Sequence, residues 1–312
     1  MRKSLFSSFS FWLFAGLAIV AMLPAIPIWT SLILGVLFAF IAPKGAGFNT
    51  TPFTKYSLQI AIVLIALSMP VTQVFETGFS GIAFIFLFVI ATALLGFLMY
   101  KFFSMQKQEA ELMTAGSAIC GGTAVATISP LIHASKSSTS IILGSIYILN
   151  ALALLIYPFI GQWIGLSDTQ FGIWAAVAVH DTASVIGTAQ SFSPQAAETA
   201  TIYKLIRTLF LFPAIFIFSM LYKQKGNKAE IPWFVILFAL VLALQFVVEI
   251  PENVTQQSSF ISRRLLQFSI FTIGTGLPLE KIKTLKGKSV FLTVLLWLIL
   301  SIVSLFAVYF LF

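Results

Sequence analysis

Long runs of apolar residues, separated by short stretches with charges or prolines, dominate the chain. A helix that spans a bilayer needs roughly 17–25 mainly apolar residues. We find about eleven candidate runs, two of them short, at residues 11–23, 29–41, 56–75, 79–103, 111–131, 140–164, 171–192, 199–222, 231–248, 260–279 and 289–312. The runs lack the period-two alternation that is typical of membrane strands. The pattern predicts an all-α, polytopic membrane protein of about eleven transmembrane helices in a single integral membrane domain, 1–312.

Composition excludes several classes of function. Apolar residues make up 59% of the chain and charged residues 9%, whereas about a quarter of a soluble domain is charged. The net charge of +8 does not indicate nucleic acid, because the Lys and Arg residues lie mostly between apolar runs and not on a soluble basic face. We therefore expect the lipid bilayer as surroundings and no nucleic-acid partner.

The distribution of charge predicts a topology. With the amino terminus inside, most of the 18 Lys and Arg residues fall in inside loops, as the positive-inside rule requires. This favours an odd number of spans, a cytoplasmic amino terminus and a carboxyl terminus outside. The alternative is that the first two runs form a hairpin that does not cross. The start resembles a signal peptide, but the apolar runs continue after it, so we interpret residues 11–23 as a first span.

An internal repeat is a further hypothesis. Residues 58–70 align without gaps on residues 266–278, with Gln59 on Gln267 and Pro70 on Pro278. The two runs are predicted to have opposite directions, and inverted repeats are common in secondary transporters. The alternative is chance similarity between apolar helices.

The run 111–131 breaks the rules for a membrane helix, because Gly116, Gly121 and Gly122 lie within it. Each glycine weakens a helix by roughly 1 kcal/mol relative to alanine. We expect a mid-membrane interruption whose second half offers N–H groups from about Gly121, Gly122 and Thr123, together with a positive dipole end. The alternative is close helix packing through small residues.

The run 171–192 contains His180 and Asp181, which are costly in a membrane unless partnered or hydrated. We expect a second interruption here, with Asp181, Thr182 or Ser184 capping the helix that restarts. The alternative is a structural ion pair or a simple cap.

The run 199–222 carries Lys204 and Arg207 three residues apart, on one helical face. At about 1.5 Å per residue, Arg207 lies some 13–14 Å below Glu198, near the midplane. We expect Asp181 to be the partner of these cations, which leaves an excess of positive charge that suits an anion. The alternatives are that Lys204 reaches the outer surface and that Arg207 only bridges helices through backbone carbonyls.

Other chemistry has no sequence support. The chain has no P-loop, no Rossmann glycine pattern and no HExxH motif. We therefore expect no enzyme activity, no cofactor and no metal site.

Three segments in order, Ala115–Gly122, Val179–Gly187 and Lys204–Arg207, resemble the YeiH/TauZ-type sulfate exporter family, from about residue 29 to the carboxyl terminus. The resemblance implies a bacterial inner-membrane protein of the inverted-repeat superfamily that includes cation–proton antiporters and bile-acid symporters. It implies scaffold and core sub-bundles interleaved in sequence, unwound helices that cross in the core, alternating access and, as often in this superfamily, a homodimer. Whether residues 111–131 cross 171–192 or 260–279, where Gly274, Gly276 and Pro278 also favour a break, stays open.

These observations together predict a secondary active transporter of a small anion, a sulfur oxyanion such as sulfate, sulfite or a sulfonate, exported by alternating access. The alternatives are a cation–proton antiporter that uses Asp181 and a membrane protein that does not transport. His180 and Asp181 are candidates to carry a coupling proton, because His titrates near neutrality. The candidate substrate-binding residues are Gly116, Ser117, Cys120, Gly121, Gly122, Thr123, His180, Asp181, Thr182, Ser184, Lys204 and Arg207.

Overall fold

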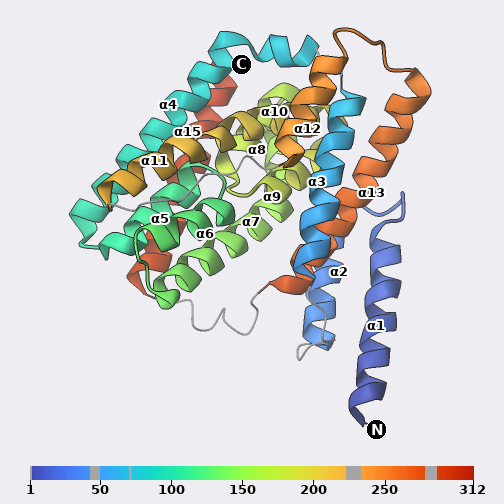
Figure 1. The fold of residues 1–312 in the computed structure, drawn as a ribbon, viewed down its shortest axis with the longest axis horizontal. Helices are drawn as coiled ribbons and strands as arrows, with labels where there is room; N and C mark the ends of the chain where they lie inside the picture. Colours follow the sequence, from blue (N-terminus) through green and yellow to red (C-terminus); the bar gives the residue numbers. More distant parts are fainter. Residues whose placement is uncertain (1, 43–49, 70–71, 223–232, 278–286) are drawn as a thin grey trace. The chain divides into compact units, whose positions relative to one another are not determined.

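The computed structural model describes residues 2–42, 50–69, 72–222, 233–277 and 287–312, and within these ranges the chain is helical with no strand. The prediction of an all-α fold is confirmed. The helices are α1 (Arg2–Ala21), α2 (Ile28–Ile41), α3 (Thr51–Ser68), α4 (Thr72–Phe103), α5 (Lys107–Ala118), α6 (Gly122–Leu131), α7 (Lys136–Ile164), α8 (Asp168–Ala178), α9 (Thr182–Phe192), α10 (Pro194–Leu209), α11 (Leu211–Leu221), α12 (Trp233–Leu244), α13 (Glu252–Gly276) and α15 (Lys288–Leu311) (Figure 1).

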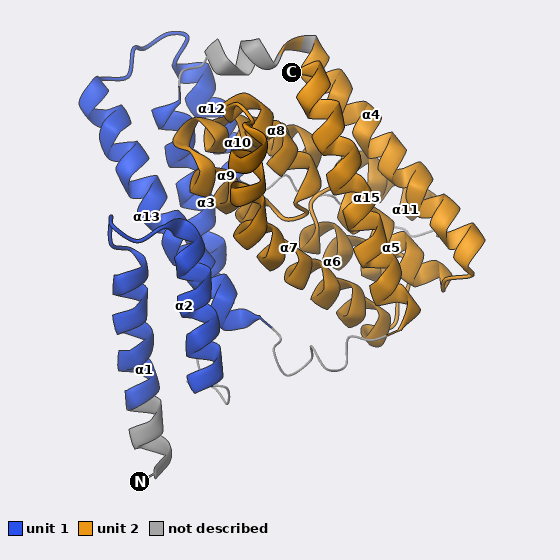
Figure 2. Cartoon of the chain, turned by 180° about the vertical axis from the view of Figure 1, so that it is seen from behind, with its two compact units in different colours: residues 1–71, 232–279 blue, residues 72–231, 280–312 orange. Residues whose placement is uncertain are grey.

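The chain divides into two compact units, each built from two separate stretches of sequence. Unit 1 contains residues 1–71 and 232–279, and unit 2 contains residues 72–231 and 280–312 (Figure 2).

Unit 1 is organised around α13, which packs against α2 and α3. A Cβ on Gly35 would lie 2.1 Å from the carbonyl oxygen of Phe271, and one on Gly274 would lie 2.5 Å from that of Leu32. Backbones this close leave no room for a side chain, so these glycines permit the contact between α2 and α13.

Hydroxyl pairs join α3 to α13. Thr54 Oγ1 donates to Thr272 Oγ1 at 2.8 Å, and the hydroxyls of Ser57 and Ser269 are 2.6 Å apart. Residues further along α3 pair with residues earlier in α13, so the two helices are antiparallel. This is the relation that an inverted repeat of 58–70 and 266–278 requires, although the repeat itself stays a prediction.

Unit 2 contains the longest apolar helices. Among the described residues, four stretches are long and apolar enough to cross a membrane: Ser80–Phe103, Lys136–Ile164, Pro194–Leu221 and Lys288–Leu311. Shorter apolar helices cover Phe9–Ala21, Ile28–Ile41 and Pro52–Ser68. The runs 111–131 and 171–192 are instead pairs of half-helices, so the count of about eleven spans stays a prediction.

An aromatic stack anchors α8 in unit 2. The ring of Tyr157 on α7 is stacked 4.3 Å from that of Trp174 on α8 and 5.9 Å from that of Trp297 on α15. Trp174 Nε1 donates to the carbonyl of Ser301 at 3.0 Å, and the hydroxyls of Tyr157 and Ser301 also pair. The first half of the second interrupted helix is therefore fixed against its neighbours.

Candidate functional site

The first interruption separates α5 from α6 at Ile119–Gly121. Gly121 has φ 62° and ψ −121°, and its N–H donates to the carbonyl of Gly116 at 2.9 Å. L-residues with a side chain rarely adopt such a backbone conformation. The predicted break in this run is confirmed, and glycine at position 121 is what allows the chain to turn there.

The two interrupted helices cross at Gly121. A Cβ on this residue would lie 3.1 Å from both the carbonyl carbon of His180 and the nitrogen of Asp181. The run 111–131 therefore crosses 171–192. The other candidate, 260–279, belongs to unit 1, where α13 continues through Gly274 to Gly276; Pro278 lies outside the described residues.

The second interruption lies between Ala178, the end of α8, and Thr182, the start of α9. Asp181 Oδ1 accepts from the backbone N–H groups of Ala183 at 2.9 Å and Ser184 at 3.1 Å. Of the three predicted caps, Asp181 is the one that caps α9, and its negative charge suits the positive end of that helix.

Asn150 on α7 holds this second break in place. Its Nδ2 donates to Asp181 Oδ2 at 2.7 Å, and its Oδ1 accepts from the backbone N–H of His180 at 3.0 Å. Asn150 is 1% exposed. Sequence reasoning missed this residue. An asparagine within the apolar run 140–164 could have been treated as a candidate functional residue, as ionisable residues at membrane depth are.

Arg207 on α10 binds the carboxyl ends of both leading half-helices. The buried guanidinium donates from Nε to Ala118 at 2.8 Å, and from one terminal nitrogen to Ala176 at 2.9 Å and Val177 at 2.8 Å. The other terminal nitrogen donates to the carbonyl of Ser117. These carbonyls lie in the last turns of α5 and α8, where a helix has unsatisfied acceptors and a negative dipole end.

Lys204 occupies the equivalent place one turn earlier on α10, and it is also buried. Its Nζ donates to the carbonyls of Val179 at 3.1 Å and Ile119 at 3.4 Å, and to that of His180. One cationic face of α10 therefore satisfies acceptors at both breaks.

The predicted ion pair with Asp181 is wrong. Within the described ranges, neither Lys204 nor Arg207 forms an ion pair with Asp181. The carbonyls at the ends of α5 and α8 have no helical partner and need donors, while Asp181 is already satisfied by Asn150 and by the start of α9. The alternative in which Arg207 bridges helices through carbonyls describes the structure.

The start of α6 differs from that of α9, because no side chain caps it. Gly122 and Thr123 form its first turn, and the Thr123 side chain is exposed. A Cβ on Gly122 would lie 2.8 Å from the hydroxyl oxygen of Tyr147 on α7, so glycine leaves space for that hydroxyl. The first-turn N–H groups therefore follow directly after the crossing at Gly121, and the Tyr147 hydroxyl lies beside Gly122.

Two buried polar side chains near the crossing are unsatisfied. Among the described residues, the Ser117 hydroxyl and both ring nitrogens of His180 have no hydrogen-bond partner, and these residues are 0% and 1% exposed. Buried polar groups are nearly always hydrogen-bonded, so this pair requires an explanation beyond packing.

The other predicted site residues have structural surroundings. Cys120 is buried in an apolar cluster, and Thr182 is half-buried at the start of α9. Gly116 packs closely, since a Cβ there would lie 2.6 Å from the side chain of Ile146. All twelve predicted residues belong to the crossing or to the face of α10 that binds it, but they play different parts.

Comparison with known proteins gives one consistent result. The family model described as "Conserved hypothetical protein 698" matches residues 6–293. A protein from Bacteroides thetaiotaomicron named "UPF0324 membrane protein" is 34% identical, over 98% of this chain and 94% of its own. A relative from Photobacterium profundum, also named as a UPF0324 membrane protein, is 32% identical over 94% of this chain and 90% of its own. No solved structure matches.

Proposed function

This chain belongs to the UPF0324 family of membrane proteins, and on that premise we propose that it is a secondary active transporter of a small anion, which it moves by alternating access. The observation that carries this proposal is the uncapped start of α6, placed where two interrupted helices cross at backbone contact. Irregular backbone at membrane depth is tolerated where it is enclosed by protein or lines a water-filled cavity, and transporters place their substrates at such breaks.

The charge at the crossing favours a negative solute. A helix start presents N–H donors and a positive dipole end to an anion. Asp181 is engaged with α9 and Asn150, so its negative charge is compensated. Lys204 and Arg207 offset the negative ends of α5 and α8. The two cations thus act on the anion through the local field and not by direct contact.

The donors around α6 suit an oxyanion. Gly122 and Thr123 offer backbone N–H groups, and Thr123 and Tyr147 offer hydroxyls. Several neutral donors spread over one turn match a solute with three or four acceptor oxygens. We therefore propose sulfate, sulfite or a sulfonate as substrate, in line with the sequence resemblance. A bacterial inner-membrane location and export as the direction are proposed from that resemblance alone.

His180 is the proposed carrier of a coupling proton. It is adjacent to the crossing, and its two ring nitrogens are without partners among the described residues. A hydrated imidazole can bind or release a proton near neutral pH, so this role requires that water reaches the buried ring beside Lys204 during the transport cycle. Coupling through this ring predicts that replacing His180 alters the pH dependence of flux more than the affinity for the anion.

A cation–proton antiporter that uses Asp181 is less well supported. This carboxylate accepts three hydrogen bonds, two at Oδ1 and one at Oδ2. A transported cation would have to displace these donors and would meet the positive face of α10.

The first test measures binding by thermal stabilisation of the purified protein. A ligand that binds the folded form raises Tm by mass action. We expect sulfite, sulfate or methanesulfonate to raise Tm, and sodium chloride at equal ionic strength to leave it unchanged. The same anions should move across the membrane of proteoliposomes.

Two hydroxyl-deleting variants locate the site. Thr123→Val and Tyr147→Phe each remove one proposed donor, and a hydrogen bond to a charged group contributes about 1.5–3 kcal/mol, so each should weaken anion binding roughly 10- to 100-fold. Thr127→Val, one turn further along α6, is the matched control. Unchanged affinity in both site variants would contradict the proposal, and stabilisation by sodium that Asp181→Asn abolishes would favour the antiporter.

A further inference from the structure

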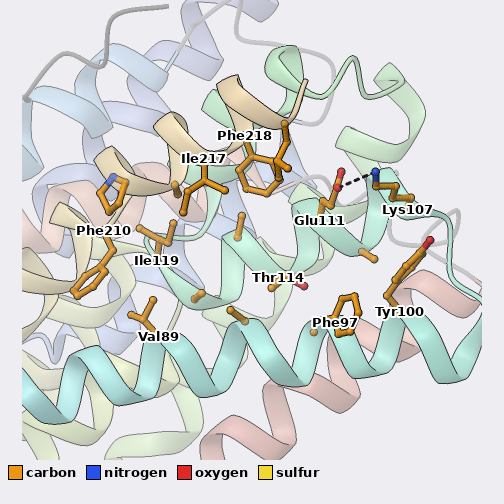
Figure 3. A pocket seen from close by; sticks show the side chains of 18 residues that line it. Val89, Phe97, Tyr100, Lys107, Glu111, Thr114, Ile119, Phe210, Ile217 and Phe218 are labelled. Atoms are coloured by element: carbon orange, nitrogen blue, oxygen red, sulfur yellow. Dashed lines mark ion pairs between the residues drawn. The ribbon is translucent and has the colours of Figure 1, made fainter. Parts of the chain in front are cut away.

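A cavity of about 490 Å³ lies within unit 2, between α4, α5 and α11 (Figure 3). Its size is within the range of about 300–1,000 Å³ found for sites that bind small molecules. Most of its lining is apolar, from residues such as Val89, Phe97, Phe210 and Ile217. Of the residues described for the proposed transport site, Ala118 and Ile119 at the first interruption also line this cavity.

The polar lining gathers at one end, where Lys107, Glu111 and Tyr100 lie together (Figure 3). Lys107 Nζ is 3.8 Å from Glu111 Oε1, and the Tyr222 hydroxyl donates to Glu111 Oε2 at 2.7 Å. The Lys107 side chain is 62% exposed, so its ammonium keeps donors for another group. This end offers charges of both signs.

The polar end lies where two apolar helices finish. Lys107 follows the end of α4 at Phe103, and Tyr222 follows the end of α11 at Leu221. Lysine and tyrosine are typical of the membrane–water interface. The mouth of the cavity is therefore at the level of lipid headgroups.

The length of the cavity matches one leaflet of a bilayer. Along α4 its lining extends from Tyr100 to Val89, a rise of roughly 16 Å at about 1.5 Å per residue. Half of a hydrocarbon core about 30 Å thick is about 15 Å. The opposite end is lined by Phe210, between α10 and α11, midway along the apolar stretch Pro194–Leu221.

We propose that this cavity binds an acyl chain of a membrane phospholipid, with the headgroup at Lys107 and Glu111. The apolar lining takes the chain, the Lys107 ammonium takes the phosphate, and the Glu111 carboxylate takes the ammonium of a zwitterionic headgroup such as phosphatidylethanolamine. The inference requires only that the chain is a membrane protein, and it does not depend on the transported substrate.

The inner end of the cavity connects this lipid to the broken helix. Ala118 and Ile119 line it, and their carbonyls accept from Arg207 and Lys204. A bound acyl chain packs against the segment that turns at the first interruption. Lipid occupancy should therefore stabilise the crossing.

Native mass spectrometry of the detergent-purified protein, titrated with dioleoylphosphatidylethanolamine, tests the proposal. We expect one lipid to stay bound to the wild-type protein at a collision energy that removes the other bound lipids. Ala93→Trp fills the cavity from α4 and should weaken binding of that lipid about tenfold or more, because binding depends on buried apolar area. Ala91→Trp, on α4 but outside the lining, is the matched control and should bind as the wild type does.

Two further measurements keep the test decisive. Ala214→Phe fills the same cavity from α11, so it replaces Ala93→Trp if that variant does not fold. Lys107→Gln should weaken phosphatidylethanolamine binding while Lys136→Gln does not. Retention of the lipid by both filled variants, or retention of free oleate in place of the phospholipid by the wild type, would overturn the proposal.

Discussion

Arg207→Met is the most informative perturbation of the crossing. It keeps the aliphatic bulk of the side chain and removes four hydrogen bonds to the carbonyls of Ser117, Ala118, Ala176 and Val177. A buried acceptor left without a donor costs about 1–3 kcal/mol. Loss of the guanidinium also removes its own desolvation cost, which offsets part of that sum. We expect a net loss of about 3–5 kcal/mol, the range for breaking one side of a buried charged interaction.

The assay is thermal unfolding of the purified protein, followed by tryptophan fluorescence. For a domain of 150–250 residues, 1 kcal/mol shifts Tm by about 2–4 °C, so Arg207→Met should melt roughly 10 °C below the wild type. Arg207→Lys should fall between the two, since an ammonium keeps the charge but lacks the planar fork that reaches both helix ends. Lys136→Met, at an exposed position, is the control and should change stability by less than about 0.5 kcal/mol.

Two results would refute this reasoning. A Tm for Arg207→Met within about 2 °C of the wild type would mean that the carbonyls do not need the guanidinium. An unchanged Tm with complete loss of stabilisation by anions would mean that Arg207 contacts the substrate directly.

Three further perturbations test other parts of the site. Gly121→Ala should cost about 1–3 kcal/mol of stability, because it strains the backbone and brings the new Cβ against His180. Gly165→Ala is the control and should cost less, since its Cβ would meet nothing within 4 Å. Equal changes in Tm would remove the argument for a backbone crossing. Asn150→Leu should lower Tm by several degrees, because it leaves Asp181 Oδ2 and the His180 N–H without their partner; a wild-type Tm would show that Asn150 is dispensable. Asp181→Asn keeps the cap, because asparagine caps helices as well as aspartate does, but it places an amide nitrogen opposite the Asn150 Nδ2 donor. We therefore expect a loss of about 1–3 kcal/mol, and a wild-type melting curve would show that this hydrogen bond contributes nothing.

The interruptions were predictable from the sequence because each breaks a rule of membrane helices. Gly121 and Gly122 weaken one helix, and His180 and Asp181 are costly in the other. The rules act on residue types, so they locate a break to within a turn without any knowledge of the fold.

The partners of the cations were not predictable in the same way. Every residue carries a carbonyl, so the sequence does not distinguish the carbonyls of Ala118 and Ala176 that accept from Arg207. A carboxylate can be recognised in the sequence, which is why Asp181 was wrongly assigned as the partner of the cations. The acceptors become visible only when both helix ends meet one face of α10.

The choice of crossing partner also needed the fold. Gly121 and Gly274 are both glycines in apolar runs, and each touches another backbone. Only the three-dimensional structure shows that Gly274 serves continuous packing of α13 on α2, whereas Gly121 serves a turn. Asn150, in contrast, could have been found by treating an amide near the centre of an apolar run as a candidate partner of backbone groups.

The placement of Lys204 and Arg207 on a single helix has a mechanical consequence. Both cations bind carbonyls at the ends of α5 and α8 at once, so α10 links these two helices. Neither α5 nor α8 can move alone without breaking charged hydrogen bonds to buried carbonyl oxygens. In the proposed alternating-access cycle, we therefore expect α5, α8 and α10 to move together as one block.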